Sequence, residues 1–172
     1  MEHYWHSNVL QLNASHYKYP ITNEKEISTP AKTIYYPANV WMVADNNDYS
    51  NKNSEFSNFH KSESNDVAMF WGKEYGNDAT INQDASQRFN PNTSITGLER
   101  FYTCYRDTLK FVQKGQSLTD QYKMLTYVFY STTDGTAYGG GVDNKIGVLW
   151  PPAVRINATR YGALAHELGH SF

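Results

Sequence analysis

The chain has 172 residues and a formal net charge of −2, with 40% hydrophobic, 15% aromatic and 19% charged residues. This composition can bury a core and is not that of a disordered chain. With a net charge of −2, the chain as a whole has no excess positive charge that would attract nucleic acid. No apolar run approaches the roughly 18 residues of a membrane span. The single cysteine, Cys104, excludes an internal disulfide framework and any multi-cysteine zinc site, and its place among apolar helix positions predicts a buried thiol.

The first 60 residues show little periodicity. Turn-forming residues at 45–53 separate short apolar pieces, of which residues 38–44 are the best strand candidate. We interpret residues 1–60 as an irregular, β-rich N-terminal extension that packs on a sheet formed by the rest of the chain. The N-terminus lacks the basic and apolar stretches of a signal peptide. Because uncharged polar residues supply most of the solubility, we expect an extracytoplasmic or secreted protein whose signal peptide has been removed.

Residues 61–172 contain clearer signals, which predict an α+β fold. A mixed twisted sheet would be backed by one helix and followed by a C-terminal helix that carries the active site. Thr93 or Ser94 can cap the first helix, and Asn157 or Thr159 the last one. The chain ends without a helix stop signal, so we expect the sequence to be truncated inside its last helix. In chain order the predicted elements are a strand at 66–72, a helix at 95–114, a strand at 122–131, a glycine-rich turn at 134–141, a strand at 145–150 and a helix at 159–172.

The last predicted helix contains two histidines four residues apart, with a glutamate directly after the first: His166, Glu167 and His170. Residues four apart lie on the same helix face, so both imidazoles can bind one Zn²⁺ at about 2.0–2.1 Å. Glu167 is offset along the helix, where its carboxylate can act as the general base. Zinc lowers the pKa of water towards about 7, which allows attack on an amide carbonyl at neutral pH. The pattern therefore predicts His166 and His170 as zinc ligands and Glu167 as the catalytic residue of a peptidase.

The simpler alternative is a pair of partly exposed helix histidines that bind no metal. A chance match to the whole pattern is expected roughly 0.01 times in a chain of this length and composition. The predicted helix and its apolar neighbours also favour the zinc site. Gly169 disfavours helix by about 1 kcal/mol relative to alanine, and its lack of a side chain predicts that another chain segment approaches the helix closely there.

These residues resemble the active helix of the zincin metallopeptidases. Zincin catalytic domains place a strand, a backing helix, further strands with a substrate-lining edge strand, and then the HExxH helix. More narrowly, the chain is similar to a mostly bacterial group of zincin-like proteins predicted to be secreted, through Phe70-Trp71-Gly72, the Trp150-Pro151 step and the sequence AHELGHSF at 165–172. The resemblance implies a zincin-like catalytic subdomain over residues 61–172, a zinc cofactor and a peptide or protein substrate. The strand at 145–150 would then line the substrate cleft.

A catalytic zinc normally has three protein ligands, and only two are visible in the motif. In the metzincin class the third ligand is a histidine six residues after the second one, and in the gluzincin class it is a glutamate from a later helix. Both positions lie after Phe172, so we expect the third ligand there, and the class stays open. His60 lies in a polar stretch and is more typical of a surface residue. We therefore expect the 172-residue chain alone to bind zinc weakly and to be inactive or nearly so.

The alternative from another functional class is a non-catalytic binding or surface-interaction module on a zincin-like scaffold, in which the metal is absent or structural. The glutamate of the motif favours the enzyme, because a binding module does not need that carboxylate. The sequence leaves substrate specificity and oligomeric state open.

Overall fold

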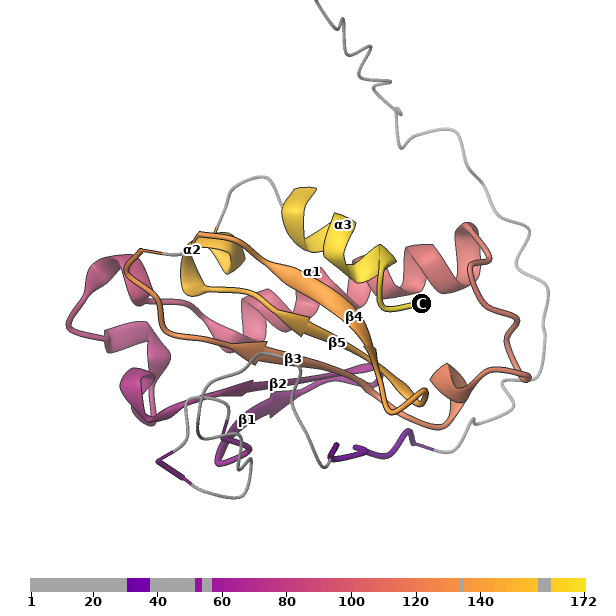
Figure 1. Ribbon diagram of the computed structural model, residues 1–172, viewed down its shortest axis with the longest axis horizontal. Helices are drawn as coiled ribbons and strands as arrows, with labels where there is room; N and C mark the ends of the chain where they lie inside the picture. Colours follow the sequence, from indigo (N-terminus) through magenta and orange to yellow (C-terminus); the bar gives the residue numbers. More distant parts are fainter. Residues whose placement is uncertain (1–30, 38–51, 54–56, 134, 158–161) are drawn as a thin grey trace, which may run out of the picture. The chain divides into compact units, whose positions relative to one another are not determined.

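The computed structural model describes residues 31–37, 52–53, 57–133, 135–157 and 162–172. These residues form a five-stranded mixed sheet in the order β1-β2-β3-β5-β4, with the helices α1, α2 and α3 on one side of it (Figure 1). The predicted α+β class is therefore confirmed. No helix within these ranges combines the length and the apolar character that crossing a membrane requires.

The sheet has a parallel centre and antiparallel edges. Strands β2, β3 and β5 run parallel to one another, while β1 and β4 each pair with one neighbour in the antiparallel direction. The three central strands are buried at every position, which explains why they stand out in the sequence as continuous apolar runs. The strands are β1 (His60–Glu63), β2 (Val67–Trp71), β3 (Met124–Val128), β4 (Tyr138–Val142) and β5 (Ile146–Trp150).

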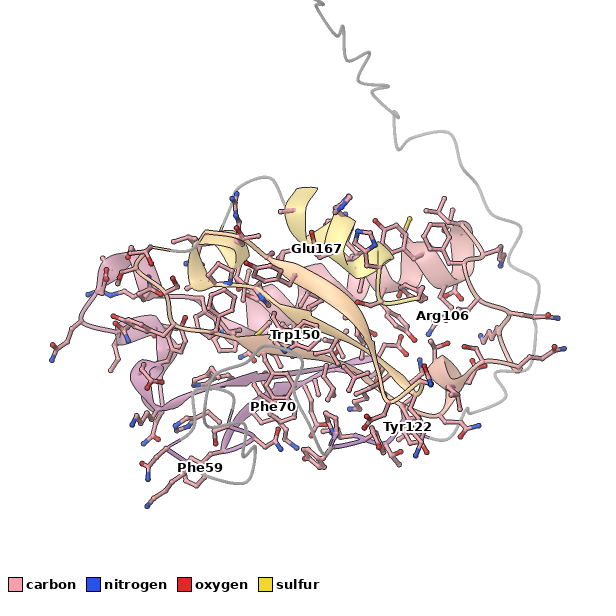
Figure 2. All side chains as sticks on the ribbon, in the orientation of Figure 1. Phe59, Phe70, Arg106, Tyr122, Trp150 and Glu167 are labelled. Carbon is pink, nitrogen blue, oxygen red and sulfur yellow. The ribbon has the colours of Figure 1, made fainter. Side chains whose placement is uncertain are left out.

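Alternate residues of the central strands point to two separate layers of core. In β2, Met69 belongs to the layer under the helices. Phe70 belongs to the layer on the opposite face, where Figure 2 labels it. Leu164 and Leu168 of α3 enter the helix-side layer and are at most 2% exposed. Each buried leucine contributes about 1.5–3 kcal/mol relative to an exposed one, so these two side chains fix α3 on the sheet.

The first helix starts earlier and ends earlier than its apolar pattern predicts. Helix α1 spans Pro91–Thr103, and the Asn90 side chain accepts hydrogen bonds from the first backbone N–H groups. Proline at the first helical position suits this start, so the predicted caps at Thr93 and Ser94 are wrong by three residues or more. A π-helical turn, Cys104–Thr108, follows, and the chain then leaves the helix at Lys110, where φ is +59°. Cys104 is exposed, so the prediction of a buried thiol is also wrong.

The glycine-rich segment predicted as a turn is the edge strand β4. It forms a hairpin with β5 through Asp143 and Asn144, whose φ angles are +53° and +50°. Two successive residues with positive φ are typical of the two-residue turn that matches strand twist. The strand predicted at 145–150 is present as β5, but β5 lies between β3 and β4. The prediction that it is an edge strand is therefore wrong, because β4 is the edge strand among the described residues. Ile146 and Gly147 of β5 nevertheless line a cavity beside His170.

Most of the N-terminal extension lies outside the described residues. That includes the strand predicted at 38–44, so the interpretation of residues 1–60 as one extension stays a prediction. The described part also contains two short α-helices near its C-terminal end: α2 (Ala153–Ile156) and α3 (Gly162–Gly169). Asn157 ends α2 and does not cap α3, and Thr159 lies outside the described residues.

Candidate metal centre

Helix α3 carries the predicted site residues and is held from two sides. Beneath it, Leu164 and Leu168 pack into the core. Beside it, the Tyr105 hydroxyl donates a hydrogen bond of 2.6 Å to the carbonyl oxygen of Ala165. The Phe172 ring, just after the helix, packs against Tyr102 with ring centroids 5.1 Å apart. The backbone that presents the two histidines is therefore fixed by both apolar and polar contacts.

The structure brings the two predicted zinc ligands together. The Nε2 atoms of His166 and His170 are 3.1 Å apart, and the rings meet edge to face with centroids 4.8 Å apart. Two nitrogen ligands of one tetrahedral zinc ion are about 3.3 Å apart. Both histidines are exposed to solvent, so a metal ion can reach them. The pair therefore fits two adjacent positions of a zinc coordination sphere.

Helix α3 ends between the two histidines, which corrects the predicted helix to residue 172. The last helical residue is Gly169, and the His170 N–H donates to the Glu167 carbonyl at 3.1 Å, three residues back. Ser171 makes the same kind of bond to Leu168 at 3.0 Å. This tighter last turn follows from the low helix preference of glycine. It still leaves the His170 imidazole beside His166.

Glu167 is less exposed than the two histidines, and its carboxylate lies near His166. Its side chain is 20% exposed, against 69% for His166, and its Oε1 atom lies 4.0 Å from the His166 Nε2 atom. Figure 2 shows Glu167 on α3 above β4. A carboxylate at this distance from a metal ligand can exchange a proton with a water molecule between them.

The closeness of Glu167 to β4 depends on a glycine in that strand. A Cβ atom built on Gly139 would lie 2.1 Å from the Glu167 carbonyl oxygen and 3.0 Å from the Glu167 Cβ. One built on Gly147 of β5 would lie 2.4 Å from the Ser171 carbonyl oxygen. Around Gly169, by contrast, a Cβ would meet nothing within 4 Å. The predicted close approach at Gly169 is therefore wrong; the close contacts between sheet and helix occur at Gly139 and Gly147 of the strands.

A cavity of about 550 Å³ opens beside His170. It lies between the end of α3, the β4–β5 hairpin and the loop at 112–119. Apolar side chains supply part of its wall: Val112, Leu118, Ile146 and Phe172. A larger cavity of about 710 Å³, in the loops after β2, touches none of the three motif residues. His170 and Glu167 of the motif and this cavity of about 550 Å³ thus lie beside the β4–β5 hairpin.

Within the described ranges, no group of three His, Cys, Asp or Glu side chains is placed to hold one metal ion. His60 is on β1, at the sheet edge opposite β4, where its ring stacks on Trp71 with centroids 5.8 Å apart. Partial burial lowers the pKa of the His60 imidazole below its usual 6.5. His60 is therefore a packing residue of the far edge, and His3, His6 and His16 lie outside the described part.

Sequence reasoning found the three motif residues but missed those that position them. Tyr105 and Gly139 lie about 60 and 28 positions before the motif, and periodicity does not connect them to it. The usable signal is the run Gly139–Gly141, which is separated from the Asp143-Asn144 turn by Val142 alone. A glycine inside a strand often marks the close approach of another backbone.

Taken together, fold and site define an α+β domain with an HExxH helix packed on the antiparallel edge of a mixed sheet. The chain belongs to the family of unknown function DUF6055, whose pattern matches residues 26–172. None of the curated proteins and none of the solved structures matches the chain.

Proposed function

We propose that this chain is part of a zinc-dependent peptidase, in which His166 and His170 are two zinc ligands and Glu167 is the general base. The observation that carries the proposal is the 3.1 Å separation of the two Nε2 atoms, with the Glu167 carboxylate 4.0 Å from one of them. The order of strand, helix, further strands and motif helix supports the proposal, because the resemblance to zincins implies such an order. As that resemblance implies, we place the third ligand after residue 172.

The positions of the two histidines and of Glu167 on α3 suggest a different role for each. A zinc ion held by the two histidines would acidify water and polarise the carbonyl group of a substrate. Glu167, which is less exposed than His166, would accept the proton from the attacking water and pass it to the leaving amine. The hydrogen bond from Tyr105 to Ala165 would keep this helix turn in place during both transfers.

Strand β4 is the element that we expect to hold the substrate. In the described part of the chain it pairs only with β5, so the backbone groups of Gly139, Gly140 and Gly141 that face outward can pair with an extended peptide. A peptide added to this edge would pass Glu167, because the Glu167 backbone lies against Gly139. The three glycines also leave this side of the site without side chains. We therefore infer a peptide or protein substrate bound by strand addition.

The experiment is hydrolysis of labelled casein by the natural protein, measured together with its zinc content. Glu167→Gln should retain zinc and lose at least about 100-fold in activity, because general acid–base catalysis supplies that order of rate. His170→Ala should lose both zinc and activity. Glu74→Gln, which removes an exposed carboxylate from the loop after β2, is the matched control and should behave as the wild type.

Full activity of the Glu167→Gln variant would contradict the proposed role of Glu167. A natural protein that binds one zinc ion per chain but cleaves no casein would instead favour the non-catalytic binding module.

A further inference from the structure

A short N-terminal segment crosses the amino ends of the parallel strands and reaches the hairpin beside the candidate site. We name residues 32–36 the strap. At one end, Lys32 forms an ion pair with Asp66, directly before β2, and donates a hydrogen bond of 3.1 Å to the Tyr102 hydroxyl. In the middle, Thr33 exchanges backbone hydrogen bonds with Gln121 and Lys123 at 3.0 and 2.9 Å. The strap is therefore anchored to the start of β2 and of β3.

The other end of the strap holds the turn between β4 and β5. The Tyr35 hydroxyl donates a hydrogen bond of 2.9 Å to Oδ2 of Asp143, and the Lys145 ammonium lies 4.5 Å from the centre of the Tyr35 ring. The hydrogen bond to Asp143 raises the pKa of Tyr35 above 10.0, so the hydroxyl is a donor at neutral pH. In Figure 1 the strap is the indigo segment beside the β4–β5 turn.

Strand β4 has fewer stabilising contacts of its own than the central strands, so the Tyr35–Asp143 hydrogen bond should matter more for it. Three of its five residues are glycine, which lose more backbone freedom on folding than other residues and supply no side chains to pack. It has one strand neighbour among the described residues, whereas β2, β3 and β5 each have two. A clamp on its turn therefore adds a restraint to a strand that has few side chains and one neighbouring strand.

We propose that Tyr35 is a positioning residue, which holds β4 in place for peptide binding by clamping the Asp143 turn. This inference rests on the proposed function, because it assigns β4 the role of substrate edge. Tyr35 itself acts only through the hairpin. The strap would thus influence the accessibility of the peptide-binding edge.

The test is amide hydrogen exchange on the whole chain, with Tyr35→Phe compared with Tyr36→Phe. Both variants remove one hydroxyl from the strap, but the Tyr36 ring packs against Phe70 of β2, and β2 is separated from β4 by β3 and β5 in the sheet. Tyr35→Phe should accelerate exchange in the β4–β5 hairpin on the order of tenfold, since it removes a charge-assisted hydrogen bond. Exchange in α1 should not change, and neither should zinc affinity.

A second readout separates positioning from simple loss of stability. In casein hydrolysis, Tyr35→Phe should raise KM on the order of threefold with kcat unchanged, because substrate binding to β4 is impaired and Glu167 is not. Adding Asp143→Asn to Tyr35→Phe should have no further effect, since the two residues act through one bond.

Equal hairpin exchange in the Tyr35→Phe and Tyr36→Phe variants would overturn the proposal. So would a uniform acceleration over the whole chain, which would mark Tyr35 as a general stabilising residue. If the natural protein cleaves no casein, the proposed function fails, but the exchange measurement still decides whether Tyr35 positions β4.

Discussion

Replacing Gly139 by alanine tests the closest contact between β4 and the motif helix. The added Cβ would lie 2.1 Å from the Glu167 carbonyl oxygen, whereas real Cβ contacts almost never fall below 3.0 Å. Strand or helix must therefore move by about 0.9 Å, and overpacking of this kind costs about 1–3 kcal/mol. The displaced atoms belong to Glu167 and its neighbours, so the same change should disturb the histidine pair.

The neighbouring glycine provides a matched control. A Cβ on Gly140 would meet nothing within 4 Å, so Gly140→Ala should be neutral or stabilise by about 0.4–1 kcal/mol through the unfolded state. In a chain of this length the Gly139→Ala variant should then melt ~5–10 °C below the Gly140→Ala variant in a thermal unfolding experiment. Zinc affinity should fall only in Gly139→Ala. Melting temperatures within about 1 °C of each other would refute the close packing of β4 on α3.

Two further predictions concern Glu99 of α1, which contacts Ser64 and Asp66, and Tyr105, which contacts α3. Burial, together with the neighbouring Asp66 carboxylate, raises the pKa of Glu99 above its usual 4.5. The stability that this group contributes is therefore complete below about pH 4.5 and is lost as the pH rises through the raised value. Glu99→Gln should gain stability relative to the wild type between pH 4 and pH 7 in urea unfolding, and a constant difference would contradict this. Tyr105→Phe should cost about 0.5–1.5 kcal/mol, because Ala165 loses a hydrogen-bond donor. An unchanged urea midpoint for that variant would show that the bond contributes nothing.

The sequence predicted the elements whose signals are strong and local. Continuous apolar runs located β2, β3 and β5, because both faces of these strands are buried. Four-residue spacing placed His166 and His170 on one side of a helix, and their Nε2 atoms are indeed in contact distance. Both the strands and the histidine pair are determined by residues that are close in sequence.

The sequence failed where distant segments determine the local structure. Gly139–Gly141 favour a turn by composition, and only pairing with β5 and packing under α3 make them a strand. The same applies to the edge position of β4, since strand order depends on connections that periodicity does not describe. The strap was also beyond prediction, because Tyr35 and Asp143 are 108 residues apart and neither belongs to a recognisable pattern.

The central claim is that His166 and His170 bind zinc together, and titration of the 172-residue chain with Zn²⁺ tests it most directly. A competing chromogenic chelator reports the affinity and the number of ions bound. We predict weak binding of one zinc ion per chain, at least about tenfold weaker in His166→Ala or His170→Ala, which corresponds to about 1.4 kcal/mol. Glu167→Gln should bind as the wild type does. Binding that is unchanged in both histidine variants would contradict the assignment of the metal centre.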